Sequence, residues 1–381
     1  MTIRIGMITP SSNTCVEPAT QTLFRDAADI SVYATRIPVT RIASDDDSDD
    51  QFDSQTMIAA ARLLADAKVD ALMWNGTSGS WLGIEGDHRI CQAIEDETGI
   101  ACTTATLGVI EACRAFGLPH ISLVSPYTAD IAERIAAEFA AHGIDVCAQE
   151  NAGLTENAAF AELSGKPVTS MTADATAASS PAMILCTNVD GSEAVSLEDE
   201  KDVLVIDSIA AAAWSAVRLV DPSFRLSGKG RLLNEGSARL ALASVTEKLL
   251  AATRADRTTL RLDSPALRCD VQRAVAEATG PRIRPIRNDA SLPQRDLNTV
   301  RQLEATRKPL VQNNFHAPPE PPEALRQVYG VAAQVLTPIE ISGDMVGWIS
   351  VHSTTERVWS PADVAAAQSA AADVAALIPT L

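Results

Sequence analysis

The stretch Ala71-Leu72-Met73-Trp74-Asn75-Gly76-Thr77-Ser78 places a loop of small polar residues directly after an apolar run. A second apolar run, Ala182–Leu185, is followed in the same way by Cys186-Thr187-Asn188. Such loops offer main-chain N–H groups and hydroxyls with little bulk, which suits the binding of a carboxylate or an oxyanion. Only the second loop begins with a thiol. The pair predicts an α/β fold in which a single cysteine faces an anion-binding loop.

The surrounding sequence predicts a parallel sheet wrapped by helices. Up to about residue 222, short apolar runs alternate with segments in which alanine and leucine recur at three- and four-residue spacing. The predicted strands are Ile3–Ile8, Ser31–Arg36, Ala71–Trp74, Ile121–Val124, Met183–Leu185 and Val203–Ile206. The predicted helices include Gln55–Ala67 and Ala129–His142.

Two parts of this region resemble each other. Thr9-Pro10-Ser11 follows the first predicted strand just as Ser125-Pro126-Tyr127 follows the fourth, and the Gly76 and Cys186 loops come next at similar spacing. We therefore predict two pseudo-symmetric, Rossmann-like halves, at about residues 1–118 and 119–225. Since ligands of open parallel sheets bind beyond the carboxyl ends of the strands, all four loops are expected at one crevice.

The pattern changes after Pro222, where Ser227-Gly228-Lys229-Gly230 interrupts it. We expect a catalytic domain over residues 1–225, a linker helix within residues 226–254 and a second domain over residues 255–381.

The second domain is predicted to be an α+β domain. Val331–Ser353 predicts a hairpin, because the turn Ser342-Gly343-Asp344 separates two apolar runs. Pro361–Leu377 predicts an alanine-rich helix with Ser360 as its N-cap and Asp363 at its third position. An antiparallel sheet flanked by helices is the expected architecture.

The composition argues against several classes of function. The net charge is -18 at pH 7, whereas nucleic acids and anionic membranes require clustered lysine and arginine. The seven cysteines lack Cys-x-x-Cys spacing and the five histidines are isolated, so neither a disulfide framework nor a metal site is implied. Met1–Ile5 resembles a strand rather than a leader, and no apolar run reaches the roughly 18 residues of a membrane span. We expect a cytoplasmic protein that binds neither nucleic acid nor membrane.

Cys186 is the candidate catalytic residue. A free cysteine is most often a small buried hydrophobe. The place of Cys186 directly after a predicted strand, and before Thr187 and Asn188, puts its thiol at the mouth of the crevice. There, converging N–H groups are expected to lower its pKa.

Gly76, Thr77 and Ser78 form the candidate anion cradle, and Pro10-Ser11-Ser12-Asn13-Thr14 is a second candidate loop. Tyr127 follows a proline at a strand end, from which its hydroxyl would reach the crevice. Each loop also fits an ordinary strand-to-helix turn whose hydroxyls cap the next helix. The residues by themselves leave both interpretations open.

The stretch Ile5-Gly6-Met7-Ile8-Thr9-Pro10-Ser11-Ser12-Asn13-Thr14, with Glu17-Pro18, resembles the opening motif of the maleate cis–trans isomerases. Gly76-Thr77-Ser78 with Cys186 resembles the site of the arylmalonate decarboxylases. Both families belong to the aspartate/glutamate racemase superfamily, and the resemblance covers about residues 1–220. It implies two pseudo-symmetric α/β halves, no cofactor, no metal, and a small carboxylate substrate held between the halves.

The resemblance also implies roles for single residues. Cys186 matches the second-half cysteine, and Asn13 and Tyr127 match carboxylate-binding residues. Asn157 matches a second-half asparagine that touches the substrate. The expected catalytic residues are Cys186, Gly76, Thr77, Ser78 and Tyr127. The expected substrate-binding residues are Pro10, Ser11, Ser12, Asn13, Asn75, Asn157, Thr187 and Asn188.

One position departs from the two-cysteine members of the superfamily. Racemases and maleate isomerases use one cysteine from each half, whereas the first-half position here is Gly76, or Asn75 if the alignment slips by one. The decarboxylase branch also has glycine there. Its loop stabilises the enediolate left when carbon dioxide departs, and its cysteine protonates the carbanion from one face. We therefore expect a cofactor-independent lyase or isomerase that acts in this way on a small mono- or dicarboxylic acid.

Two alternatives stay open. The first is maleate isomerisation, in which the thiolate of Cys186 adds to the double bond. The second is a sensor that has lost catalysis, which the absence of a first-half cysteine would fit.

The second domain resembles a GAF domain. The similarity lies in its long leading helix, in Gly347-Trp348-Ile349-Ser350-Val351, and in Trp359-Ser360-Pro361 before the last helix. GAF domains bind small molecules or mediate dimers. The resemblance therefore implies a small-molecule ligand for this domain and a homodimer for the chain.

Overall fold

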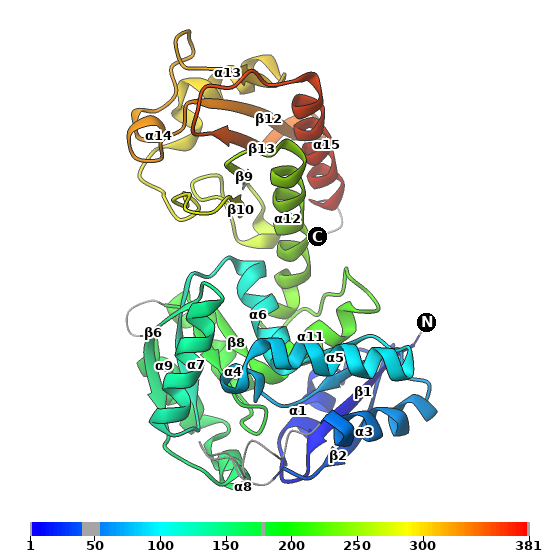
Figure 1. Cartoon of the computed structure of the whole chain (residues 1–381). Helices are drawn as coiled ribbons and strands as arrows, with labels where there is room; N and C mark the ends of the chain where they lie inside the picture. The colour runs from blue at the N-terminus through cyan, green and yellow to red at the C-terminus, as the bar shows by residue number, and fades with distance from the viewer. Residues whose placement is uncertain (1, 40–53, 177–179, 379–381) are drawn as a thin grey trace. The chain divides into compact units, whose positions relative to one another are not determined.

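The computed structural model describes residues 2–39, 54–176 and 180–378 (Figure 1). The chain divides into two compact units. The first comprises Met1–Arg114 with Leu118–Ser237, and the second comprises Ala115–Gly117 with Ala238–Leu381. The division between Ser237 and Ala238 falls within the long helix α12 (Arg231–Thr253). The domain boundaries at residues 225 and 254 remain predictions.

The first half of the first unit is built on a parallel sheet with the strand order β2-β1-β3-β4. Its strands are β1 (Ile3–Pro10), β2 (Ile30–Ile37), β3 (Ala71–Trp74) and β4 (Cys102–Thr104), and its helices are α1 (Val16–Leu23), α3 (Ser54–Asp66), α4 (Gly79–Leu82), α5 (Ile84–Thr98) and α6 (Ala105–Phe116).

The second half repeats this architecture with the strand order β6-β5-β7-β8. Its strands are β5 (His120–Ser125), β6 (Asp145–Asn151), β7 (Ala182–Ile184) and β8 (Val205–Asp207), and its helices are α7 (Ala129–Ala141), α8 (Asn157–Phe160), α9 (Lys166–Ala175), α10 (Leu197–Lys201) and α11 (Ser208–Arg218). The two sheets share one order and one direction, so the prediction of two similar α/β halves is confirmed.

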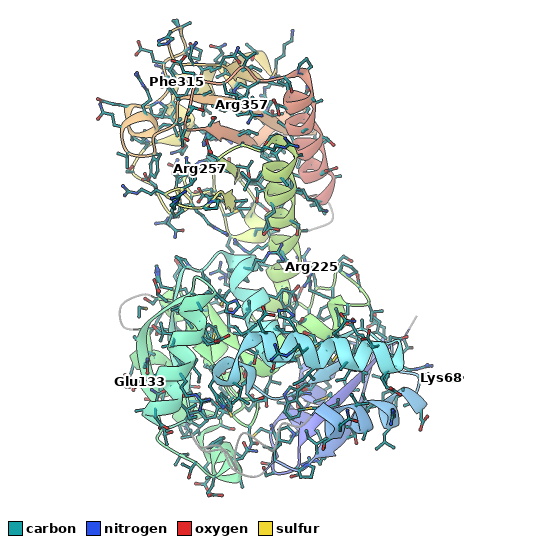
Figure 2. All side chains as sticks on the ribbon, viewed as in Figure 1. Lys68, Glu133, Arg225, Arg257, Phe315 and Arg357 are labelled. Carbon is teal, nitrogen blue, oxygen red and sulfur yellow. The ribbon has the colours of Figure 1, made fainter. Side chains whose placement is uncertain are left out.

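The central strands are continuous apolar runs because both faces of each sheet are covered. Ile5, Leu72 and Met183, for example, are fully buried. Helix α11 follows the second sheet in sequence but packs on β3 and β4 of the first. This exchange interlocks the two halves. Charged residues such as Lys68 and Glu133, labelled in Figure 2, are exposed on the surface of the first unit.

The sequence analysis missed two strands of the first unit, β4 and β6, and three of the second, Arg257–Leu262, Ala276–Thr279 and Leu310–Gln312. β4 has only three residues, too few for a pattern. β6 alternates exposed and half-buried positions and is rich in polar residues, because it is an edge strand. The predicted strand Val203–Ile206 is displaced in the structure to Val205–Asp207.

The second unit contains an antiparallel sheet with the strand order β10-β9-β13-β12-β11. Its strands are β9 (Arg257–Leu262), β10 (Ala276–Thr279), β11 (Leu310–Gln312), β12 (Ala333–Ile341) and β13 (Asp344–Ser353), and its further helices are α13 (Asn298–Thr306), α14 (Glu323–Gln327) and α15 (Pro361–Leu377). Figure 1 shows α12 and α15 side by side against this sheet, and both contribute to its apolar core.

Two local predictions in the second unit are confirmed. The β12–β13 turn has positive φ at Ser342 (+54°) and Gly343 (+90°), as a tight two-residue hairpin requires. Helix α15 begins with a capping box between Ser360 and Asp363. In the described part of the chain, none of the helices is both long enough and apolar enough to span a bilayer.

Gly108 lies in α6 where that helix meets α11. A Cβ added there would stand 2.6 Å from the main-chain oxygen of Ala211, an atom that cannot move without α11. Gly108→Ala is expected to lower the free energy of unfolding by about 1–3 kcal/mol, the usual cost of overpacking. Urea unfolding followed by circular dichroism measures the change.

Gly86→Ala in α5 is the matched control. The nearest atom to its added Cβ is a terminal nitrogen of Arg89, 3.8 Å away. This variant should be as stable as the parent or more stable by up to about 1 kcal/mol, because alanine is the better helix former. Equal stability of the two variants would contradict the tight α6–α11 contact.

Candidate active site

The candidate site lies at the carboxyl ends of the central strands of the two sheets. Loops leave β1 and β3 at Pro10 and Trp74, and loops leave β5 and β7 at Ser125 and Ile184. In each sheet these two strands are neighbours, and the strand order reverses between them. Side chains from the loops meet across the two halves, as expected at the switch point of an open α/β sheet.

Cys186 is buried at this meeting point, with 3 % of its surface exposed. The N–H of Asn188 donates to its sulfur at 3.4 Å, and the side chain of Tyr127 is close enough to shift the pKa of the thiol. The N–H of Cys186 donates to Oγ of Ser208 at 3.1 Å. These contacts fix the thiol on the loop that follows β7.

Burial raises the pKa of the Cys186 thiol to about 12. Tyr127 and the N–H of Asn188 lower this pKa by less than burial raises it, and the neighbouring Cys15 and Asp207 raise it further. The expectation of a lowered pKa is therefore wrong, because the loss of hydration destabilises the thiolate more than the two donors stabilise it. At neutral pH Cys186 is a thiol with a proton to donate.

Tyr127 connects the thiol to the first half of the unit. Its hydroxyl lies 2.7 Å from the hydroxyl of Thr77. Its ring packs edge-on against Trp81 and Phe160, with centroid separations of 5.2 and 5.5 Å. Burial raises the pKa of Tyr127 well above its usual value, so the hydroxyl stays protonated. Tyr127 therefore contacts the loop after β3 through Thr77 and influences the thiol of Cys186.

The loop after β3 presents three consecutive unpaired donors. Among the residues that the structure describes, the N–H groups of Gly76, Thr77 and Ser78 have no hydrogen-bond partner. All three residues are buried, so these N–H groups do not lie at the molecular surface, where water would pair with them. Successive main-chain N–H groups of this kind form a concave binding site for an anion.

The side chain of Asn75 is a further unpaired group. It is fully buried, and neither its Nδ2 nor its Oδ1 has a hydrogen-bond partner within the described residues. Its main-chain carbonyl, by contrast, accepts from Oγ1 of Thr187 at 2.6 Å. A buried polar group without a partner costs on the order of 1–3 kcal/mol. This cost indicates that the polar atoms of a bound ligand can supply the missing hydrogen-bond partners of Asn75.

The other predicted binding residues bond to one another across the two halves. Nδ2 of Asn13 donates to Oγ1 of Thr187 at 3.2 Å, and Nδ2 of Asn157 donates to Oγ of Ser12 at 2.7 Å. Asn188 donates through Nδ2 to the main-chain carbonyl of Asn157. The structure brings these five residues together, and their hydrogen bonds hold the loops in place.

Two predicted residues contribute no donor to the site. Ser11 is exposed, and its Oγ accepts from the N–H of Val39 at 3.2 Å. Pro10 ends β1, and its carbonyl accepts from the N–H of Asn13 at 3.0 Å. Both residues shape the turn after β1 rather than face the thiol.

Gly76 has no room for a side chain. A Cβ added there would stand 2.2 Å from the indole of Trp74, which is itself fully buried. A cysteine at this first-half position would collide with that ring. Position 76 therefore cannot supply a second thiol, and the first-half cysteine that neighbours Cys186 is Cys15, in the loop after β1.

Three polar neighbours of the site escaped the sequence analysis. They are Ser208, which accepts from the N–H of Cys186; Asp207, whose pKa burial raises to about 7; and Ser164, whose hydroxyl lies 3.4 Å from Sγ of Cys15. Asp207 ends β8 and Ser208 follows it, at the same place in the sheet as the other site loops, so the same signal was available. Within the described ranges, histidine, cysteine, aspartate and glutamate form no group that could hold a metal ion.

Comparison with known proteins places both units in families. Residues 5–233 match the arylmalonate decarboxylase family, and residues 238–378 match the GAF domain. The maleate isomerase of Nocardia farcinica is 23 % identical over 246 residues, which is 62 % of this chain and 97 % of that protein. The arylmalonate decarboxylase of Bordetella bronchiseptica is 27 % identical over 187 residues, which is 48 % of this chain and 78 % of that protein.

Solved structures resemble the same part of the chain. A liganded arylmalonate decarboxylase with a glycine and a cysteine exchanged for other residues has a TM-score of 0.56 at 25 % identity, over 61 % of this chain and 100 % of that one. A Nocardia farcinica maleate cis–trans isomerase mutant with a covalently bound succinylcysteine intermediate has a TM-score of 0.56 at 21 % identity. The match covers 61 % of this chain and 98 % of that one.

Cys186 is expected to resist alkylation in the native protein. Iodoacetamide reacts with thiolates, and burial keeps Cys186 both covered and protonated, whereas Cys147 is exposed. At pH 8, peptide mass spectrometry should find Cys147 labelled at least about ten times faster than Cys186. The two should react alike in denaturant. Equal labelling rates in the native protein would contradict a buried, neutral thiol.

Proposed function

The chain belongs to the arylmalonate decarboxylase family through residues 5–233, and from this we propose a cofactor-independent lyase that removes one carboxyl group from a small disubstituted malonic acid. Cys186 is the proton donor in this proposal. The observation that supports it most directly is the buried, neutral thiol of Cys186 beside Tyr127, whose hydroxyl bonds to Thr77 in the loop of unpaired N–H groups. The closed space at Gly76 leaves no place for a thiol at that position.

The first step is the loss of carbon dioxide. The N–H groups of Gly76, Thr77 and Ser78 bind the carboxylate that stays, with the hydroxyl of Tyr127 beside them. When the bond to the other carboxyl group breaks, its electron pair moves to the α-carbon and into the bound carboxylate, which gives an enediolate. Preorganised donors stabilise this charge, and removal of one such donor typically costs about 3 kcal/mol of barrier.

The second step is protonation of the α-carbon. The S–H bond of Cys186 breaks and a C–H bond forms, which leaves a monocarboxylate and a thiolate. Because the thiol has a pKa of about 12, its thiolate is strongly basic and recovers a proton from solvent. The net reaction consumes one proton and releases one carbon dioxide. The raised pKa also keeps Cys186 protonated, and so able to donate a proton, in alkaline solution up to about pH 12.

Maleate isomerisation is the second candidate, supported by the match to nearly the whole length of the Nocardia farcinica maleate isomerase. In that reaction Cys186 would add to the double bond as a thiolate. The neutral state of Cys186 favours decarboxylation, because addition first requires removal of the thiol proton at a high pKa.

We also propose that the chain is a cytoplasmic homodimer, since GAF domains often assemble through their long helices and α12 has 23 residues. Light scattering of the purified chain tests the dimer. The sensor alternative would gain if a small acid bound to the chain and none was turned over.

Cys186→Ala should lower turnover of a 2-aryl-2-methylmalonate by about 10²–10⁴-fold, the usual contribution of a positioned general acid. Release of carbon dioxide from the full chain measures the rate. The fold should persist, because the change removes only one sulfur atom from a site held by other hydrogen bonds.

Cys147→Ala is the matched control, since this exposed cysteine lies outside the site; its rate should equal that of the parent. Full activity of the Cys186→Ala variant would remove the thiol from the mechanism. Conversion of maleate to fumarate by the parent, with a maleate adduct on Cys186 by intact-mass measurement and no release of carbon dioxide from malonates, would favour the second candidate.

A further inference from the structure

The first unit contains a cavity of about 250 Å³ that is separate from the candidate active site. Its walls come from helix α1, from the short helix η3 (Ser192–Ser196), from the junction of β8 and α11, and from the loop that precedes α12. Cys186, Tyr127 and the 76–78 loop do not line it. The volume is close to the lower end of the range of about 300–1,000 Å³ for small-molecule sites in proteins.

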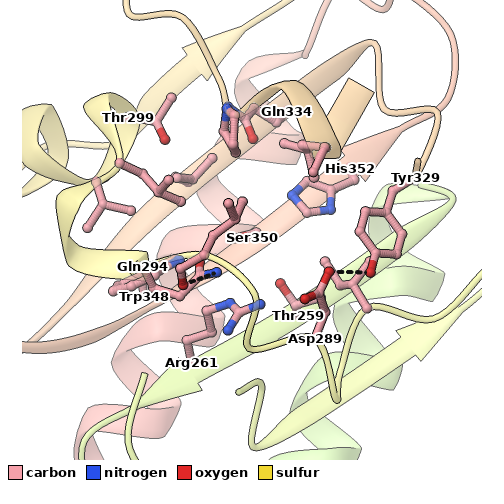
Figure 3. Close-up of a pocket in the computed structure, with 18 residues that line it drawn as sticks. Thr259, Arg261, Asp289, Gln294, Thr299, Tyr329, Gln334, Trp348, Ser350 and His352 are labelled. Atoms are coloured by element: carbon pink, nitrogen blue, oxygen red, sulfur yellow. Dashed lines mark hydrogen bonds between the residues drawn. The ribbon is translucent and has the colours of Figure 1, made fainter. Parts of the chain in front are cut away.

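This first-unit cavity is larger than the pocket of the second unit, which is drawn in Figure 3 and holds about 60 Å³. In that pocket, the charge of Arg261 is met by the nearby carboxylates of Glu277 and Asp289. The first-unit cavity presents the opposite case, because a buried carboxylate there is met by no cation.

Asp207 is this buried carboxylate. It ends β8 and lines the cavity, with 5 % of its surface exposed. As the N-cap of α11 it accepts from the N–H of Ile209 at 3.3 Å. Among the described residues, no lysine, arginine or histidine forms an ion pair with it. Buried charges in proteins are normally paired, so Asp207 lacks a countercharge.

A second buried acid of the same region, Glu198, is paired in the usual way. It is 4 % exposed, and its carboxylate accepts from the N–H groups of Val205 and Arg231 at 3.1 and 2.8 Å. Burial raises the pKa of Glu198, and the positive charge of Arg231 opposes this effect. For Asp207, burial raises the pKa to about 7, and the nearby carboxylate of Asp190 raises it too. A positive charge in the cavity would offset both effects.

Most of the remaining lining is apolar. The apolar side chains beside Asp207 are Ala19, Leu23, Val195, Val205, Ile209 and Leu232. Lys229 also lines the cavity, but its ammonium group forms no ion pair with Asp207 or Asp190. Such a lining suits an apolar body that carries one positive charge.

We propose that the first-unit cavity binds a small organic amine in its ammonium form, with the carboxylate of Asp207 as the counterion and the apolar side chains around its body. The lining residues belong to the first unit alone. The binding does not depend on which reaction this unit catalyses, so it is measured without turnover.

Benzylamine is the probe, and the full chain is titrated by calorimetry at about pH 8, where Asp207 is ionised. Amide hydrogen exchange locates the binding and should slow in peptides that cover residues 190–196 and 226–233. Asp207→Asn should weaken the binding at least about ten-fold, the usual loss for a charged hydrogen bond, because asparagine keeps the N-cap but not the charge. Neutral benzyl alcohol should bind at least about ten times more weakly than benzylamine.

Glu193→Gln is the matched control. It removes a negative charge from η3, but Glu193 is exposed and does not line the cavity, so this variant should bind benzylamine as the parent does. Ala19→Leu fills the cavity from α1 without a change of charge and should also weaken binding, which keeps a test available if Asp207→Asn does not fold. Equal affinity of either cavity variant and the parent, equal binding of the alcohol, equal weakening by Glu193→Gln, or no protection of the two segments would overturn the proposal.

Discussion

The hydroxyl of Tyr127 makes the contact on which the candidate active site depends. It hydrogen-bonds to Thr77 in the first half of the unit, and the Tyr127 side chain also shifts the pKa of Cys186 in the second half. These residues are far apart in the chain. Two aromatic rings, of Trp81 and Phe160, hold its own ring in place. The distance between the thiol and the anion-binding loop therefore depends on how the two α/β halves pack, and α11 interlocks those halves by covering the sheet of the first.

The same packing explains the chemistry of the site. Burial keeps Cys186 protonated and leaves the side chain of Asn75 and the N–H groups of the 76–78 loop without partners among the described residues. Each unpaired group costs free energy in the closed site. A bound carboxylate would satisfy them, so the free energy of substrate binding and the stabilisation of the enediolate come from the same groups. A site of this kind is suited to an anion and to the donation of one proton.

The sequence predicted where most of these groups lie along the chain, but not their protonation or the space around them. Small polar residues after apolar runs correctly indicated where β1, β3, β5 and β7 end, because parallel strands buried on both faces are continuous apolar segments. The pKa of Cys186 could not be predicted, since the degree of burial depends on Tyr127 and the loops of the other half. The collision of Trp74 with a side chain at Gly76 likewise depends on the path of the loop. In the second unit, the charged residue Arg257 is visible in the sequence, but its ion pair with Glu277 forms only in the folded sheet.

The central claim is that a single thiol delivers the proton to one face of the enediolate. The most direct test is decarboxylation of a prochiral 2-aryl-2-methylmalonate in D₂O, with the enantiomeric composition and the deuterium content of the product measured together. The account predicts one enantiomer that carries one deuterium at the α-carbon and does not exchange it afterwards. A racemic product, or continued exchange at the α-carbon, would require a second acid–base group on the opposite face and would contradict the account.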